Sequence, residues 1–185
     1  MRCFISVDVE NHKLRTMLEE LSRVGTKLRI LDPEKLHITL KFLGEVSEES
    51  TADILNAMDR SLSTFSQFEA SLNGIGAFPK LSYMRVVWAG VRKNSDRFIE
   101  MQGKIDKNLA PLGFHPERRF HPHLTLARVK SQEGKEALLT FISENQERSF
   151  GDFTVSSVRL KKSVLMPEGP VYSTLGETKL KRETT

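Results

Sequence analysis

Two stretches of the sequence, residues 36–43 (LHITLKFL) and residues 121–128 (HPHLTLAR), alternate in polarity as β-strands do and share the pattern His-x-Thr-apolar. Residues two apart on a strand point to the same face of a sheet. Each stretch therefore places one histidine and one threonine side by side, with apolar residues on the opposite face. Such a strand packs helices on one face and opens its polar face to a cleft. The paired polar residues are His37 with Thr39, and His123 with Thr125.

The two motifs occupy matching positions in an internal repeat. Each half of the chain, about 1–80 and 81–185, has the order strand, helix, His-x-Thr strand, helix, strand, and a further strand is expected at 170–180. This mixed order predicts an α+β fold with mainly antiparallel sheets. We expect a single domain of two lobes related by a pseudo-twofold axis, with helices on the outer faces and a central cleft. Residues 153–166 are expected to form one strand run, and the tail at 181–185 is expected to fray.

The composition is that of an ordinary globular protein. Hydrophobic residues make up 38% of the 185 residues and charged residues 28%, which argues against disorder. The single cysteine, Cys3, excludes an intrachain disulfide and suits a reducing compartment. No apolar run approaches the roughly 20 residues that span a bilayer. We therefore expect a monomeric, cytoplasmic protein without membrane association. The net charge of +4 is compatible with a polyanionic partner such as RNA, although many basic proteins bind none.

A pseudo-twofold axis would let the two polar strand faces confront each other, so that two imidazoles and two hydroxyls meet. An imidazole has a pKa of about 6.5, so one histidine can be neutral while the other is protonated. The neutral one can take a proton from an attacking water, and the protonated one can give a proton to the departing oxygen. The threonine hydroxyls can hydrogen-bond the non-bridging oxygens of a phosphoryl group. This scheme requires no metal or cofactor, and it suits a phosphodiester held in a strained ring.

At these residues the chain resembles the 2H phosphoesterases, and most closely the RNA 2′,3′-cyclic phosphodiesterases, also called 2′-5′ RNA ligases. The matching segments extend from residue 3 to about 176 and include FISVDV, PEKLHITLKFLGEV, FHPHLTLARV and VYSTL. The resemblance implies a bilobal fold and metal-free hydrolysis of a 2′,3′-cyclic phosphate to a 2′-phosphate. It also implies that His37 is the proton donor and His123 the proton acceptor. The implied partner is RNA with a cyclic phosphate end, tRNA fragments among the candidates.

Three further residues are candidates for substrate binding. Arg128 follows the second motif, and arginine suits phosphate, but on a regular strand its side chain would share the face of the apolar residues. It reaches the cleft only if the strand ends or bulges there. Lys41 lies on the cleft face by alternation, where a solvated rim lysine is the simpler interpretation. Tyr172 could contact a nucleotide or could simply pack. By the same alternation, Phe42 is expected in the core, and Trp88 lies in a strongly apolar strand that also indicates the core.

Alternative interpretations remain for the site. His121 and His123 could bind a metal from one strand face, but zinc would need at least one more protein ligand. The basic segments 116–119, 159–162 and 179–182 are ordinary solvated surface unless they surround the cleft, where they could hold an RNA backbone.

The function also has alternatives. The cleft could bind RNA ends without reacting, or could chiefly join them through a 2′-5′ linkage. No phosphate-binding G-x-x-x-x-G-K-[ST] loop and no lysine motif for adenylylation is present, which argues against an ATP-driven ligase.

Overall fold

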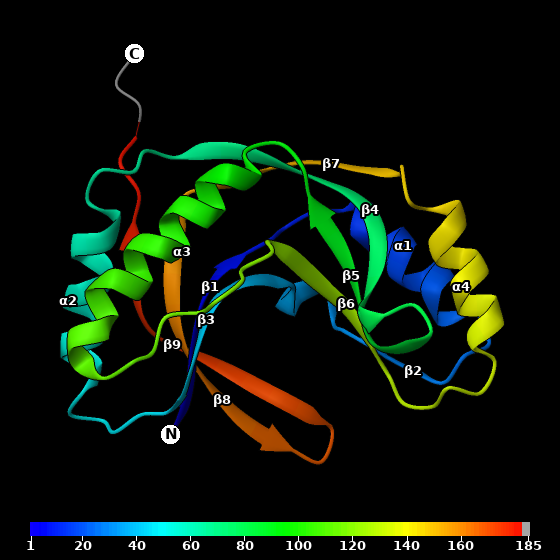
Figure 1. Ribbon diagram of the computed structural model, residues 1–185, viewed down its shortest axis with the longest axis horizontal. Coiled ribbons are helices and arrows are strands. Elements are labelled where there is room, and N and C mark those ends of the chain that lie inside the picture. The colour runs from blue at the N-terminus through cyan, green and yellow to red at the C-terminus, as the bar shows by residue number, and fades with distance from the viewer. Residues whose placement is uncertain (183–185) are drawn as a thin grey trace.

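A computed structural model describes residues 1–182 of the protein (Figure 1). Most of the expected frayed tail at 181–185 therefore lies outside the described residues. The strands are β1 (Arg2–Asp8), β2 (Leu28–Ile30), β3 (His37–Glu45), β4 (Phe68–Lys80), β5 (Tyr83–Val91), β6 (His123–Val129), β7 (Ser149–Val155), β8 (Ser157–Met166) and β9 (Gly169–Lys179). The α-helices are α1 (Lys13–Ser22), α2 (Thr51–Leu62), α3 (Ser95–Leu109) and α4 (Lys135–Glu144), with short 3-10 turns at Pro33–Lys35 and Ala110–Leu112.

All the strands belong to one curled antiparallel sheet. Their order is β7-β4-β5-β6-β3-β1-β8-β9, and the short β2 pairs with β6 beside this path. Both His-x-Thr strands, β3 and β6, lie in the middle of this order and next to each other. The α+β class with antiparallel pairing, as predicted from the order of the elements, is confirmed.

The two halves of the sequence exchange strands. β4 belongs to the first half of the chain but pairs with β5 and β7 of the second half. β8 and β9 belong to the second half but extend the sheet from β1. The spatial lobes, β1-β3-β8-β9 and β4-β5-β6-β7, therefore do not follow the expected boundary near residue 80. Strand exchange of this kind joins the halves through several long-range pairings, which the order of consecutive elements does not reveal.

The helices cover the two ends of the curled sheet. α2 and α3 pack against each other at one end, and Figure 1 shows α1 and α4 together at the other end. Each helix buries the apolar stripe that its 3.6-residue periodicity predicts. In α1 the buried residues are Leu14, Met17, Leu18 and Leu21, and in α3 they include Phe98, Met101, Ile105 and Leu109. The apolar faces of β3 and β6 close this core, so their polar faces remain on the concave side.

The expected strand run at 153–166 is two strands. β7 ends at Val155 and β8 begins at Ser157, and the two lie at distant positions in the sheet, on β4 and on β1. The carbonyl of Ser156 between them accepts a hydrogen bond from Leu180 N at 2.9 Å. Alternation of polar and apolar residues continues through this break, so the sequence pattern does not reveal it. In residues 1–182, no helix combines the length and the apolar character needed to cross a bilayer.

Candidate active site

The site is built on the contact between β3 and β6. Ile38 of β3 is paired with Leu124 of β6 in antiparallel register, and both side chains are fully buried. Each of these residues is the middle of its own motif. The histidine and the threonine on either side of it must then point to the opposite, concave face of the sheet.

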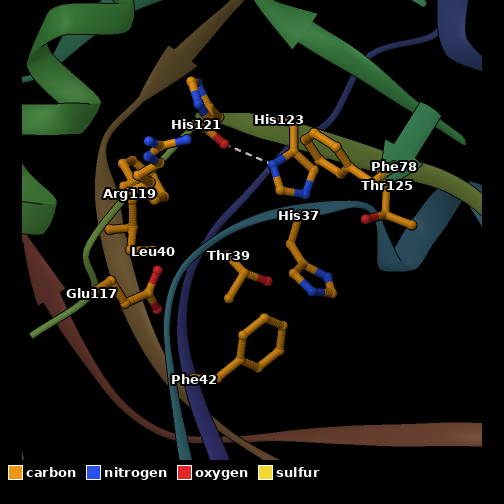
Figure 2. Close-up of a pocket in the computed structure, with 11 residues that line it drawn as sticks. His37, Thr39, Leu40, Phe42, Phe78, Glu117, Arg119, His121, His123 and Thr125 are labelled. Carbon is orange, nitrogen blue, oxygen red and sulfur yellow. Dashed lines mark hydrogen bonds between the residues drawn. The ribbon is translucent and has the colours of Figure 1, made fainter. Parts of the chain in front are cut away.

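That concave face forms a pocket of about 210 Å³. Figure 2 shows His37 and His123 projecting from neighbouring strands toward the same space, with Thr39 and Thr125 beside them. The two motifs, 86 residues apart in the sequence (123 − 37), therefore contribute to one wall. The pocket is lined by His37, Thr39, Leu40, Phe42, Phe78, Glu117, Arg119, Phe120, His121, His123 and Thr125.

The two imidazoles are held in the same way. His37 Nδ1 lies 2.8 Å from the carbonyl oxygen of Lys35, and His123 Nδ1 lies 2.7 Å from that of His121. A carbonyl oxygen can only accept a hydrogen bond, so Nδ1 is the protonated nitrogen of each ring. In the neutral tautomer, Nε2 of each ring is then left with a lone pair for proton transfer.

Aromatic rings surround both histidines. The centroid of the His37 ring lies 5.0 Å from that of Phe4 and 5.3 Å from that of Tyr172. The His123 ring lies 4.9 Å from the ring of Phe78, edge to face. These apolar neighbours exclude water from the sides of the imidazoles, so each ring is only partly exposed.

This burial lowers the pKa of both histidines below its ordinary value. Desolvation is the main cause for His37, and the charges of Lys161 and Arg128 lower its pKa further, while the Lys35 carbonyl and Asp8 oppose the shift. For His123, desolvation is again the main cause, and the His121 carbonyl opposes it. An anionic phosphoryl group between the rings would favour their charged forms and raise both pKa values.

Lys41 does not lie on the cleft face, so that prediction is wrong. In the pairing of β3 with β1, Ile5 is opposite Lys41 and Ser6 is opposite Thr39, which leaves Leu40 as an extra residue in β3. This bulge interrupts the alternation, and Leu40 and Lys41 are both buried, Lys41 with 2% exposure. Lys41 points toward α3, where it forms an ion pair with Asp106.

The same bulge turns Phe42 into the pocket. Its side chain is 70% exposed and lines the cavity, so the expected core position is wrong. Trp88 is not a core residue either. Its strand position pairs with Thr125 on the cleft face, and its partly buried ring lies 5.1 Å from Phe78 and 6.4 Å from His123.

A matching bulge in β6 decides the position of Arg128. Val87 pairs with Ala127 and Trp88 with Thr125, so Leu126 is the extra residue. Arg128 is thereby exposed, although it does not line the pocket, and its positive charge contributes to the lowered pKa of His37. The strand bulge on which the prediction for Arg128 depended is present, while its role in substrate binding stays a prediction. Tyr172 contacts His37 edge to face, and burial raises its own pKa.

The other polar residues of the pocket come from the segment 113–122. His121 is exposed beside His123, and within residues 1–182 no cluster of three or more His, Cys, Asp or Glu side chains has the geometry of a metal site. From the basic segment 116–119, Arg119 lines the pocket together with Glu117, whose pKa is raised by burial.

Sequence reasoning missed several pocket residues. Phe4 does not line the pocket, but its place beside His37 could have been found, because Phe4 alternates with Ser6 and Asp8 in the sequence of β1. Phe78 carries no such signal, since it reaches the pocket only through the pairing of β4. Glu117 and Arg119 belong to the basic segment 116–119, for which the sequence left a place beside the cleft open without singling out either residue.

Comparison with known proteins agrees with the family resemblance found in the sequence. Residues 11–163 match the model of the 2′-5′ RNA ligase superfamily. A protein of Methanothermobacter thermautotrophicus named RNA 2′,3′-cyclic phosphodiesterase is 38% identical over 177 residues, 94% of this chain and 95% of its own. A protein of the same name from Methanocaldococcus jannaschii is 39% identical over 180 residues, 96% of this chain and 99% of its own.

The fold also has a solved relative. The crystal structure of the protein TT0787 of Thermus thermophilus superposes with a TM-score of 0.80 and 27% sequence identity, and the match covers 100% of both chains. Family match, relatives and fold agree with the resemblance carried by the two His-x-Thr motifs. The chain belongs to the 2′-5′ RNA ligase superfamily, in the family of the RNA 2′,3′-cyclic phosphodiesterases.

Proposed function

We propose that the protein hydrolyses the 2′,3′-cyclic phosphate at an RNA or nucleotide end and leaves a 2′-phosphate. The proposal rests mainly on one observation: two imidazoles with Nδ1 bound to a carbonyl line a single pocket with two threonines. The names of the relatives support the same substrate class.

In the proposed reaction, Nε2 of neutral His123 takes a proton from a water that attacks the phosphorus. The bond from phosphorus to the 3′-oxygen breaks, and that oxygen receives a proton from Nε2 of protonated His37. Thr39 and Thr125 donate hydrogen bonds to the non-bridging oxygens as negative charge grows there. Each proton transfer of this kind contributes a rate factor of roughly 10²–10⁴.

The assignment of His37 as proton donor and His123 as proton acceptor follows the resemblance to the 2H phosphoesterases, and charged neighbours act on His37. Asp8 stabilises the protonated form of His37, although Lys161 and Arg128 oppose it. The charged neighbour that acts on His123 is His121, which disfavours protonation. The pKa of both rings is lowered, and an anionic substrate between them would raise it again, so that one ring can carry the proton for the leaving oxygen.

Arg128 and Tyr172 are proposed to bind substrate near His37. Arg128 is exposed and its guanidinium acts on His37, and the ring of Tyr172 lies 5.3 Å from the ring of His37. Lys41 has no place in this proposal, because its ammonium group is buried and paired with Asp106.

The test uses a short RNA with a 2′,3′-cyclic phosphate end, in the presence of a chelator. Wild-type protein is expected to form a 2′-phosphate end, and His37→Ala and His123→Ala are expected to lose most of this turnover. His12→Ala, an exposed histidine at the start of α1, serves as the matched control. Activity lost on chelation would instead support a metal site, and formation of a 3′-phosphate would contradict the proposed leaving oxygen.

Joining of RNA ends is the second candidate, favoured by the description of the superfamily. A 5′-hydroxyl in place of water would give a 2′-5′ linkage with the same two histidines. The ratio of joined to hydrolysed RNA at realistic end concentrations separates the two activities. Tight retention of the cyclic end without either product would support a binding module instead.

A further inference from the structure

A buried ion pair lies behind the pocket, on the opposite side of β3 from the two motifs' polar residues. Lys41 is 2% exposed and Asp106 of α3 is 5% exposed. Besides the ion pair with Asp106, the ammonium group of Lys41 donates a hydrogen bond of 2.8 Å to the carbonyl oxygen of His115. The lysine therefore joins β3 both to α3 and to the segment that follows α3.

The other oxygen of the Asp106 carboxylate is also used. It accepts hydrogen bonds from Gln102 Nε2 at 2.7 Å and from the backbone N–H of Glu117 at 2.8 Å. Lys41 and Asp106 thus each bind one backbone group of the same segment, the carbonyl of residue 115 and the N–H of residue 117. Apolar side chains of similar size could fill this space but could not bind these two groups.

The segment held in this way is residues 113–122, which forms neither helix nor strand. It contributes a large part of the pocket wall: Glu117, Arg119, Phe120 and His121. Within the described residues, the backbone hydrogen bonds found for 115–122 involve His115 O, Glu117 N and His121 O. The first two go to Lys41 and Asp106.

The third hydrogen bond is the one that matters for catalysis. The carbonyl oxygen of His121 accepts from Nδ1 of His123 and so sets the tautomer and the orientation of that ring. His37 has the same kind of partner, but its carbonyl comes from Lys35, which lies outside the segment. A displacement of 113–122 would therefore disturb one histidine and spare the other.

We propose that Lys41 and Asp106 are positioning residues, whose buried pair fixes the 113–122 segment so that the His121 carbonyl holds His123 as a base. The role in catalysis rests on the proposed phosphodiesterase function. Burying two charges has a large desolvation cost, and a buried pair replaced by apolar residues often leaves stability unchanged or higher. The positioning of a backbone segment explains why a lysine and an aspartate occupy this place.

The experiment compares wild type with the double variant Lys41→Met/Asp106→Leu, which replaces the pair by apolar groups. Its melting temperature is expected to stay within about 5 °C of wild type. Amide hydrogen exchange in 113–122 is expected to accelerate. Nitrogen NMR of the imidazoles is expected to show mixed tautomers for His123 and an unchanged Nδ1–H tautomer for His37. The kcat for cyclic-ended RNA is expected to fall roughly 10- to 100-fold, with a smaller change in KM.

A second pair of variants tests the same contact from the segment and leaves the buried pair in place. Glu117→Pro removes the backbone N–H that donates a hydrogen bond to Asp106. Glu117→Ala keeps this N–H and removes only the side-chain carboxylate. The proline variant is expected to lose more kcat and more His123 tautomer order than the alanine variant. If the double variant does not fold, this comparison decides the question.

Wild-type exchange in 113–122 and an intact His123 tautomer, in a folded double variant or in Glu117→Pro, would overturn the proposal. The measurements distinguish a failure of this positioning role from a failure of the proposed phosphodiesterase function. Absence of phosphodiesterase activity in wild type would refute that function, while hydrogen exchange and the imidazole spectra would still report whether Lys41 and Asp106 hold the segment and His123.

Discussion

Ile38 lies directly opposite Leu124 in the sheet, and each is the central residue of its own His-x-Thr motif. An antiparallel pair has a local twofold axis through its midpoint. If the antiparallel register of this pair is extended by one residue in each direction, His37 lies across from Thr125 and Thr39 lies across from His123. A phosphoryl group bound over the pair would therefore meet one imidazole and one hydroxyl from either strand.

Removal of either histidine is expected to have nearly the full effect of removing both. His37→Ala and His123→Ala should each lower kcat/KM about 10²- to 10⁴-fold, because each proton transfer loses its side chain. The kcat/KM of the double variant should be at most about tenfold below that of the less active single variant, because the two histidines act as a unit. Steady-state kinetics on a cyclic-ended RNA measure this. Independent, multiplicative losses would argue against a shared reaction.

The threonine hydroxyls are expected to act on the transition state. Thr39→Val and Thr125→Val keep the shape but remove the donor, and each should lower kcat about 10²- to 10³-fold with little change in KM. Thr154→Val, on the exposed face of β7, is the matched control. A rise in KM at constant kcat would show that the hydroxyls bind ground state and transition state equally.

The pH dependence follows from burial of the imidazoles. Because the pKa of both His37 and His123 is lowered from 6.5, the protonated donor is lost as pH rises through a value below 6.5. The bell-shaped profile of kcat/KM, which reports the free enzyme, should therefore have its maximum below about pH 6.5 and fall toward pH 8. A maximum above pH 7 would contradict the direction of these shifts.

Breaking the buried ion pair from one side should cost stability. Asp106→Ala leaves the Lys41 ammonium buried without its counter-ion, which is expected to lower the free energy of unfolding by about 3–5 kcal/mol. Urea denaturation gives the value. Asp96→Ala, exposed in the first turn of the same helix, is the control and should cost no more than about 1 kcal/mol. If Asp106→Ala lowered the free energy of unfolding by no more than about 1 kcal/mol, the Lys41 ammonium group would have to be hydrated in the variant.

The exposed ring of Phe42 is expected to serve substrate binding and not stability. Phe42→Ala should leave the melting temperature nearly unchanged, since the ring is 70% exposed. If the ring stacks on a nucleobase, KM should rise about 5- to 100-fold. Leu165→Ala removes another exposed apolar side chain, 77% exposed and outside the pocket, and should not alter KM.

The sequence by itself determined which side chains of the two motifs face the pocket. Alternation around His37, Thr39, His123 and Thr125 holds over the first four residues of each motif, because side-chain direction in a regular strand is a local property. The same local reasoning predicted the helix stripes and the α+β class. Arg128 could be placed only conditionally, since its direction depends on whether the strand bulges.

The tertiary structure decided what lies beyond those four residues. A bulge is fixed by the register of the neighbouring strands, so the outcome for Lys41, Phe42 and Trp88 depended on β1, β5 and β6 and not on their own sequence context. The exchange of β4, β8 and β9 between the halves is likewise set by long-range pairing. The segment 113–122 lines the pocket, and two of its backbone groups bind Lys41 and Asp106, which belong to other elements of the fold. Local pattern thus fixed the direction of the histidine and threonine side chains, while non-local pairing fixed the surface around them.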